Sequence, residues 1–411
     1  MLKNFSYLSA INLVNLAFPL FIIPILLEKL GKNNYGMFVT GVALAQFFSV
    51  FIKLSFDLLG ARDIALNKNN AEQKSKIYHS INLAKNILFG LCFFLYIGFL
   101  ELYYDLDATQ RWVFYLAYII NISDIYYASW YFQGIEKMQN ITIIGFVQKI
   151  IYLLGIIFLV HQPQDIVLLM MLQGISIVLV SFISNQLVLK DCLKASRNNL
   201  AMAKVYTKEA LPLSLPSFIN MFKERIGYIV ISKYLGSTMV TYYDIADKIR
   251  QVISMPFTMI NQVVYPKVAV SKSAAPYQKF FFGSILASLF IVAALYFGID
   301  FALDFYKNGD FKPASHVIKV LGSTCILTAA CSFVSTFLIP LDLKYRYYEI
   351  FYLSFVLSVI HLLLIWLMNW HSIEFVIYGT LFVNIVNALH FCWVIYHHRL
   401  FKASTPIINP N

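Results

Sequence analysis

The chain has 411 residues, of which 59% are hydrophobic, 17% are aromatic and only 13% are charged, and its mean hydropathy is +0.68. Because soluble domains carry about 25% charged residues, this composition excludes an ordinary soluble domain and predicts an integral membrane protein. The net charge of +11 does not indicate a nucleic-acid-binding protein, since the basic residues are spread over many short segments rather than gathered in one patch.

Apolar stretches of about 20 residues, the length that crosses a bilayer as a helix, recur along the chain. The predicted spans lie near 8–27, 36–58, 79–100, 112–132, 141–160, 166–188, 210–231, 240–264, 280–303, 317–339, 350–368 and 375–396. No connection reaches the roughly 50 residues that a folded extramembrane domain needs. We therefore predict an all-α membrane protein of about twelve transmembrane helices, with its function built inside the membrane.

The first span ends in LLEKLGKNN without a small-residue cleavage site, so we expect it to remain as a span rather than act as a signal peptide. The loops on the side of the N-terminus carry most of the basic loop residues, among them Arg62, Lys68, Lys190, Lys208, Lys267, Lys272, Lys344 and Arg399. Positively charged loops stay in the cytoplasm. Both termini are therefore predicted to be cytoplasmic, which agrees with an even number of spans.

Eight cations fall within the predicted spans: Lys53, Lys85, Lys149, Lys223, Arg225, Lys248, Arg250 and Lys319. Each costs roughly 2.5–3.5 kcal/mol at a helix centre, so such residues normally face a bundle interior or a watery cavity. A cavity lining and a structural ion-pair network are both open interpretations. For Lys53 and Lys319, near the ends of their spans, snorkelling to the membrane surface is a further alternative.

Helical spacing refines this interpretation for the two most charged spans. In span 240–264, the polar residues that recur at spacings of three and four are Asp244, Asp247, Lys248, Gln251, Ser254, Thr258 and Gln262. Asp244 and Lys248 are i,i+4 partners, and Asp247 and Arg250 are i,i+3 partners. In span 210–231, Lys223 and Arg225 lie about 200° apart around the helix. Lys223 shares a face with Asn220, Glu224 and Gly227, whereas Arg225 points elsewhere.

Acids within the spans are candidates for proton or sodium coupling. They are Asp57, Asp124, Asp244 and Asp247, with Glu224 beside the central cations. Asp244 and Asp247 each have a cation one turn away, which favours a structural pair. Asp124 has no partner close in sequence and is the preferred coupling site.

The two halves of the chain show a weak internal repeat at an offset of 205 residues. Aligning EKLGKNNYGMFVTGVALAQF (28–47) with KYLGSTMVTYYDIADKIRQV (233–252) places Leu30 and Gly31 opposite Leu235 and Gly236. Such duplication is typical of transporters. It predicts an N-terminal lobe of six helices at 1–188, a basic cytoplasmic linker at 189–209, and a second six-helix lobe at 210–411, arranged around a central cavity.

Motifs for catalysis and metal binding are scarce. The sequence contains no Gly-rich phosphate loop ending in Gly-Lys-Ser/Thr, its five cysteines form no CxxC pair, and its eight histidines form no HxxxH pair. We expect no enzymatic activity, no cofactor and no catalytic metal.

Three segments resemble one known family. FDLLGARDIALNKNN (56–70), WYFQGIEKMQN (130–140) and NLAFPLFIIPILLEKLGKNNYG (15–36) are similar to the corresponding segments of O-antigen and polysaccharide-repeat-unit flippases. WYFQGIEK is the most specific of these. The flippases belong to the multidrug/oligosaccharidyl-lipid/polysaccharide exporter superfamily, which also contains multidrug antiporters and lipid II flippases.

The resemblance implies a substrate, an oligosaccharide on undecaprenyl pyrophosphate, that is flipped across the bacterial inner membrane by alternating access, with ion-gradient coupling. We expect Lys223, Arg225, Lys248 and Arg250 to bind the pyrophosphate, assisted by Lys85, Lys149 and Lys53, because cations lower the cost of moving a dense anion through the bilayer. The implied partners are membrane lipid, a polysaccharide polymerase and a chain-length regulator. No nucleic-acid partner is expected.

Two other classes remain as alternatives. A cation-coupled multidrug antiporter would favour a cavity of acids and aromatics, whereas here cations dominate the central spans. A membrane glycan polymerase or ligase would usually carry its catalytic residues in a large outer loop, and no outer loop predicted here exceeds about 15 residues.

Overall fold

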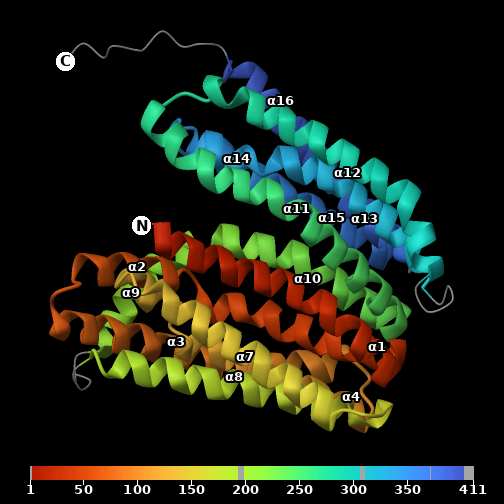
Figure 1. Cartoon of the computed structure of the whole chain (residues 1–411), viewed down its shortest axis with the longest axis horizontal. Helices are drawn as coiled ribbons and strands as arrows, with labels where there is room; N and C mark the ends of the chain where they lie inside the picture. Colours follow the sequence, from red (N-terminus) through yellow and green to blue (C-terminus); the bar gives the residue numbers. More distant parts are fainter. Residues whose placement is uncertain (1, 193–198, 306–310, 371, 402–411) are drawn as a thin grey trace. The chain divides into compact units, whose positions relative to one another are not determined.

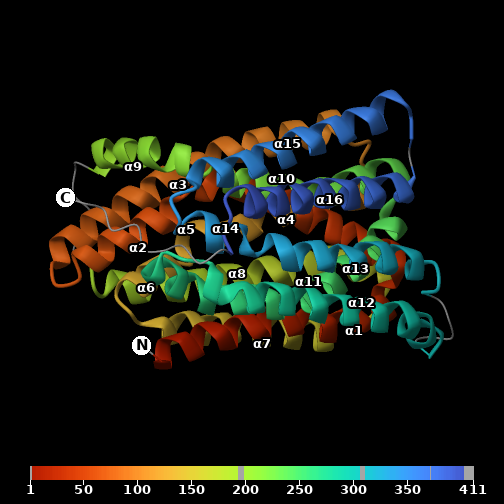
Figure 2. The same cartoon turned by 90° about the horizontal axis from the view of Figure 1, so that it is seen from above.

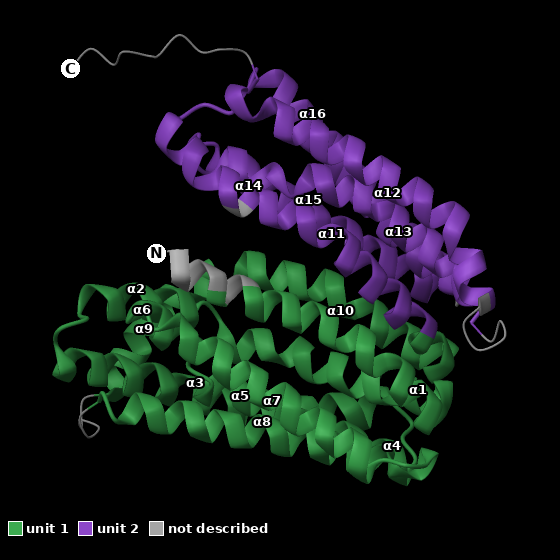
Figure 3. Ribbon diagram, in the orientation of Figure 1, with its two compact units in different colours: residues 1–241 green, residues 242–411 purple. Residues whose placement is uncertain are grey.

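The computed structural model describes residues 2–192, 199–305, 311–370 and 372–401. Helices are the only regular secondary structure over these ranges (Figure 1). By their internal contacts the helices form two compact units, residues 1–241 and 242–411 (Figure 3). The predicted all-α membrane fold is therefore confirmed.

The helices of unit 1 are α1 (Leu2–Lys53), α2 (Phe56–Leu66), α3 (Ala71–Tyr103), α4 (Ala108–Ala117), η1 (Tyr118–Asn121), α5 (Ile122–Tyr126), α6 (Ser129–Gly134), α7 (Met138–Leu159), η2 (Pro163–Asp165), α8 (Ile166–Leu189), α9 (Asn199–Leu213), α10 (Leu215–Leu235) and the first turns of α11 (Ser237–Ser271). Unit 2 holds the rest of α11 with η3 (Ala275–Tyr277), α12 (Gln278–Phe305), α13 (Ala314–Cys331), α14 (Phe333–Leu338), α15 (Lys344–Leu367) and α16 (Ile373–His397).

Eight helical segments in the described ranges are long and apolar enough to cross a membrane. They are Ala10–Lys53, Ala71–Tyr103, Met138–Leu159, Pro163–Leu189, Ala275–Asp304, Ala314–Leu338, Lys344–Leu367 and Ile373–His397. The count of twelve is not confirmed, for three physical reasons. The first two predicted spans join in α1, the span at 112–132 is broken into α4, η1, α5 and α6, and α10 and α11 carry clustered charges.

The predicted internal repeat has a structural counterpart at two glycines. Gly31 interrupts α1 with φ 75° and ψ 170°, and Gly236 separates α10 from α11 with φ 83° and ψ 169°. Side-chain-bearing residues rarely adopt this conformation. No atom lies within 4 Å of a Cβ added at either position, so the backbone angles, and not crowding, require glycine. The two aligned segments therefore turn in the same way.

These two corners also pack against each other within unit 1. The Thr241 hydroxyl donates a hydrogen bond to the carbonyl oxygen of Lys32 over 2.6 Å. A Cβ placed on Gly36 would lie 1.8 Å from the carbonyl oxygen of Ser237, so only glycine permits this close backbone approach.

Unit 1 also contains α10, which packs against α1 and lies beside it in Figure 1. The contacts consequently divide the chain between Thr241 and Tyr242. The lobes predicted at 1–188 and 210–411 remain a prediction. Of the predicted linker 189–209, residues 193–198 lie outside the described residues.

Helix α9, which begins within the predicted linker 189–209 and ends at Leu213, is an amphipathic helix on the surface of unit 1. Its buried face carries Tyr206, whose hydroxyl donates to the Asp63 carboxylate over 2.7 Å. Burial, and then the bond to Asp63, raise the pKa of the Tyr206 phenol, so the phenol stays protonated and remains a donor. Leu200, Lys204 and Lys208 are exposed on α9.

The segments 56–70 and 130–140, which carry the family resemblance, pack together as α2 and α6. A Cβ on Gly60 would lie 2.5 Å from the Trp130 ring, and one on Gly134 would lie 2.7 Å from Ile64. Trp130 is almost completely buried in the hydrophobic core of unit 1. These two glycines explain how the two motifs meet: each removes a side chain where the other helix needs room.

In unit 2, α13 packs against both α12 and α16, and α15 packs against α16; Figure 2 shows these helices from above. At one end, Phe281, Phe333, Phe337 and Phe391 form a buried aromatic core. Helix ends in both units are capped by side chains: the Asn70 and Ser372 side chains accept backbone hydrogen bonds at the starts of α3 and α16, as expected for N-caps.

Candidate functional site

Unit 1 holds a group of two cations and two acids, Lys53, Asp57, Lys85 and Asp124, which we call the unit 1 quartet. The Lys85 ammonium lies 2.6 Å from an Asp57 carboxylate oxygen and donates to the Asp124 carbonyl oxygen over 2.8 Å. The Lys53 ammonium lies 3.0 Å from an Asp124 carboxylate oxygen. The side chains come from α1, α2, α3 and α5, so only the folded unit brings them together.

The two cations of this quartet differ in access. The Lys85 side chain is 0% exposed and lies 5.9 Å from the Trp130 ring centroid. Its ammonium is enclosed by the Asp57 carboxylate, the Asp124 carbonyl oxygen and the Trp130 ring. The Lys53 side chain is 45% exposed, although its partner Asp124 is only 6% exposed. Lys53 is thus held at one side by a buried acid and remains open to a second anion.

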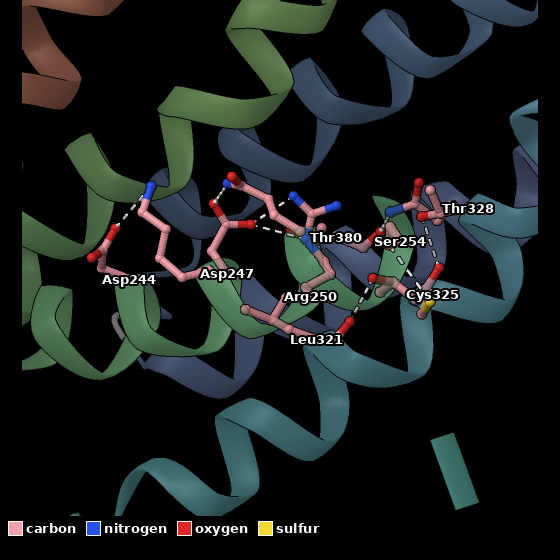
Figure 4. A network of polar contacts seen from close by, with 12 residues as sticks. Asp244, Asp247, Arg250, Ser254, Leu321, Cys325, Thr328 and Thr380 are labelled. Carbon is pink, nitrogen blue, oxygen red and sulfur yellow. Dashed lines mark hydrogen bonds and ion pairs between the residues drawn. The ribbon is translucent and has the colours of Figure 1, made fainter. Parts of the chain in front are cut away.

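Unit 2 carries a second group of two cations and two acids on α11, which we call the unit 2 quartet (Figure 4). Its members are Asp244, Asp247, Lys248 and Arg250. The Arg250 guanidinium donates to one Asp247 carboxylate oxygen from Nη2 over 2.6 Å and from Nε over 2.9 Å. Lys248 and Asp244 lie 3.8 Å apart. Both predicted helical pairs are confirmed.

The acids of the unit 2 quartet are buried, whereas the Lys248 and Arg250 side chains are each 24% exposed. The Gln251 amide donates to the second Asp247 oxygen over 2.8 Å. Both carboxylate oxygens of Asp247 are therefore occupied, which fixes the carboxylate under the guanidinium. Each quartet pairs two cations with two acids and carries no net formal charge, which reduces the cost of placing charge within a membrane protein.

The polar stripe of α11 continues beyond the quartet. The Ser254 hydroxyl lies 3.5 Å from the Cys325 sulfur on α13 (Figure 4), and the Asn261 amide donates to the Ser332 hydroxyl over 2.6 Å. These bonds join α11 to the neighbouring helix. Of the other stripe residues, Thr258 is exposed, and the side chain of Gln262 lies outside the described part of the structure.

Helix α10 carries the Lys223-Glu224-Arg225 run. Lys223 and Arg225 are partly buried, whereas Glu224 and Asn220 are exposed. The Arg225 guanidinium carbon lies 5.8 Å from the Tyr228 ring centroid, a cation–π distance. The buried Arg225 Nε makes no hydrogen bond within the described ranges. Arg225 therefore retains an unused donor on a side chain that is not fully enclosed.

The two remaining in-span cations lie apart from the quartets. The Lys149 ammonium on α7 lies 4.9 Å from the Phe18 ring centroid. The Lys319 ammonium forms an ion pair of 2.5 Å with Asp300, which satisfies its charge without the need to snorkel.

Asp124, preferred from the sequence because no partner lies close to it, has tertiary partners in Lys53 and Lys85. Asp57 is likewise paired with Lys85. Sequence spacing could not predict these pairs, because they join different helices. The roles of these residues in binding or coupling remain predictions. Among the described residues, no three His, Cys, Asp or Glu side chains are grouped so that they could hold a metal ion.

Comparison with known proteins gives matches of two kinds. Residues 1–272 match the model of a family described as polysaccharide biosynthesis proteins. Two relatives are each named "Putative O-antigen transporter". The one from Shigella dysenteriae is 26% identical over 275 residues, 66% of this chain and 67% of the relative. The one from Escherichia coli (strain K12) is 23% identical over 273 residues, 65% of this chain and 64% of the relative.

Two solved structures share the fold. The lipid II flippase MurJ in an inward closed conformation superposes with a TM-score of 0.72 at 14% identity, covering 94% of this chain and 87% of that chain. An inward-facing multidrug resistance MATE family transporter of the MOP superfamily superposes with a TM-score of 0.70 at 13% identity, covering 94% and 96%. Both similarities span nearly the whole chain, and at these identities they establish the fold.

Proposed function

The chain belongs to the family of polysaccharide biosynthesis proteins, and from this premise we propose that it flips an oligosaccharide linked to undecaprenyl pyrophosphate. The cargo would move from the cytoplasmic to the periplasmic leaflet of a bacterial inner membrane by alternating access. The observation that carries the proposal is the pairing of partly exposed cations, Lys53 and Arg250, with the buried acids Asp124 and Asp247 in an all-helical membrane protein. The names of the two relatives, which are transporter names, support a transporter rather than an enzyme.

The chemistry of the quartets suits an anionic cargo that must be bound and then released. Pyrophosphate is a dense anion that binds guanidinium and ammonium groups through charge-assisted hydrogen bonds. Arg250 presents a planar fork suited to phosphate oxygens. At rest each cation is neutralised by its own acid, so an arriving phosphate competes with that acid instead of meeting a bare charge. Such competition keeps the affinity moderate, which a carrier needs to release its cargo.

We assign the head-group contacts to Lys223, Arg225, Lys248 and Arg250, with Lys53 and Lys149 as additional cations. Lys85 is enclosed, and in this proposal it holds Asp57 and the backbone of Asp124 in place rather than touching the cargo.

The same competition suggests how an ion gradient could drive transport. When phosphate draws Lys53 away, the buried Asp124 carboxylate loses its directly paired cation, a state that favours binding of a proton or a sodium ion. Asp124 is therefore our first candidate for ion coupling. Asp57, Asp244, Asp247 and Glu224 follow it.

A second candidate function, a cation-coupled multidrug antiporter, is favoured by one observation: Asp124, Asp244 and Asp247 are buried acids, and acids suit cationic drugs. Each of them already has a cation within 4 Å. A cationic drug would have to displace that cation, which makes the anionic cargo the better match.

The test uses a host strain from which the gene is deleted. Lipid-linked glycan is extracted, its amount is measured, and its sidedness is determined with a membrane-impermeant reagent. We expect glycan to accumulate on the cytoplasmic face, surface polysaccharide to be lost, and the intact gene to restore both. Arg250→Ala and Lys53→Ala should restore export poorly at normal expression. Lys76→Ala, which removes a partly exposed cation paired with the exposed Glu72, serves as the matched control.

Unchanged lipid-linked glycan together with altered sensitivity to cationic drugs would reject the flippase and favour the antiporter. Full export by both Arg250→Ala and Lys53→Ala would reject the assigned residues while leaving the cargo class standing.

A further inference from the structure

Unit 2 has two adjoining pockets at the end where α11 and α16 finish and α12 begins. The larger has a volume of about 740 Å³, and its walls include Phe281, Phe282, Tyr396 and Phe401. The smaller has a volume of about 240 Å³ and is lined in part by Lys272, Leu341 and His398. Arg399 lines both. An aromatic compartment is thus joined to a basic one through a single arginine.

The backbone places two long cations at this junction. Lys272 follows the last residue of α11 with φ 48°, and Arg399 follows the end of α16 with φ 50°. Glycine is the usual residue in this left-handed conformation after a helix. Beyond Arg399 the chain turns back, and the Phe401 ring packs 5.5 Å from Phe281 and 5.6 Å from Phe337, between ring centroids. The aromatic core therefore fixes one wall of the larger pocket, which Phe281 and Phe401 line.

The smaller pocket has an excess of positive charge. Lys272 donates to the Pro340 carbonyl oxygen over 2.8 Å and forms a 3.5 Å ion pair with the exposed Asp342. Arg399 is exposed and makes no ion pair with any acid in the described part of the chain. Burial, and then the charges of His397 and Arg346, lower the pKa of His398, so His398 adds no charge at neutral pH. At the smaller pocket, the two cations Lys272 and Arg399 are thus opposed by one acid, Asp342.

The larger pocket opens onto a surface that a bilayer would cover. Phe282, Cys392 and Tyr396 are exposed on α12 and α16, and these helices lie within two of the candidate membrane spans. Basic pockets beside cytoplasmic ends of membrane helices bind anionic lipid head groups, and the loop charges predict this end to be cytoplasmic. The volume of the larger pocket falls in the range of about 300–1,000 Å³ seen for small-molecule sites.

We propose that these two pockets bind one anionic phospholipid of the bilayer, with its phosphate at Lys272 and Arg399 and one acyl chain along Phe281, Phe282 and Phe401. The residues that line the two pockets include no member of either charged quartet. It does not depend on the proposed cargo, so its test can fail while the flippase assignment stands, and the reverse.

The full-length protein, purified in detergent, is titrated with phosphatidylglycerol, phosphatidylcholine, undecaprenyl phosphate or inorganic phosphate, and bound molecules are counted by native mass spectrometry. Phosphatidylglycerol should bind about tenfold more tightly than zwitterionic phosphatidylcholine. Lys272→Asn and Arg399→Asn should each weaken phosphatidylglycerol binding about tenfold and leave phosphatidylcholine binding unchanged. Asparagine is chosen because it tolerates the left-handed backbone.

Three variants complete the test. Asp342→Asn removes the opposing acid and should tighten phosphatidylglycerol binding. Phe282→Ala should weaken both phospholipids alike. Lys279→Ala removes an exposed cation at the same end that lines neither pocket and should change nothing. Melting temperatures identify any variant that fails to fold.

Equal affinity for the two phospholipids, or unchanged binding by both cation variants, would overturn the proposal. Tighter binding of undecaprenyl phosphate than of phosphatidylglycerol would overturn it in favour of a cargo site. Binding of inorganic phosphate as tight as that of the lipid would overturn it in favour of a free-anion site.

Discussion

The two partners of the Lys85–Asp57 ion pair are buried to different extents, and this difference predicts how much stability each single substitution costs. The Lys85 side chain is 0% exposed, whereas the Asp57 side chain is 40% exposed. Among the described residues, removing the acid leaves the buried Lys85 ammonium with the Asp124 carbonyl oxygen as its hydrogen-bond acceptor and no directly paired carboxylate. Removing the lysine leaves a carboxylate that water can reach. The two single substitutions should therefore differ in cost.

The structure sets the order of the costs. Asp57→Ala creates an uncompensated buried charge, which costs about 3–5 kcal/mol. Lys85→Met keeps the volume of the side chain and leaves one buried carbonyl without a donor, which costs about 1–3 kcal/mol. In the double variant the buried charge is gone, so adding Lys85→Met to Asp57→Ala should restore stability. Replacing a buried ion pair as a whole is often close to neutral.

The assay is thermal unfolding of the purified protein in detergent. One kcal/mol shifts the melting temperature by about 2–4 °C for a unit of this size, so Asp57→Ala should lower it by at least about 6 °C, and Lys85→Met should lower it less. Glu72→Gln, which breaks the exposed pair with Lys76, is the matched control and should cost about 0–1 kcal/mol. The reasoning is refuted if Asp57→Ala costs no more than the control, or if the double variant is less stable than Asp57→Ala alone.

Two other predictions concern the backbone and the docking of α9. Gly31→Ala and Gly236→Ala should destabilise the protein by similar amounts, about 1–3 kcal/mol each, because both glycines adopt the same rare backbone angles. Melting temperatures test this. The control is Gly90→Ala, at a helical glycine with open space around it, which should be neutral or slightly stabilising. A normal melting temperature for either variant would contradict the backbone argument. Tyr206→Phe removes the hydrogen bond to Asp63 and should cost about 1–3 kcal/mol. The melting temperature tests this, and an unchanged value would argue that other contacts hold α9.

The sequence alone was sufficient for features that depend on chain composition or on the geometry of one helix. Low charge content and long apolar stretches indicate a membrane protein whatever the tertiary arrangement. The Asp244–Lys248 and Asp247–Arg250 pairs follow from the helical period, because residues three or four apart share a face. Gly31 and Gly236 could be aligned because the two segments have the same local pattern.

The tertiary structure decided what depends on different helices meeting. Lys85 meets Asp57 across 28 residues of sequence, because the side chains of α2 and α3 converge there and no spacing rule covers that approach. The predicted span at 112–132 is broken in the middle, although its composition suits a continuous helix. The sequence shows no partner close to Asp124, yet in the folded unit Asp124 lies on α5 and pairs with Lys53 on α1. Hydrophobicity and helical period are properties of a segment, whereas the partner of a buried charge is a property of the packed helices around it.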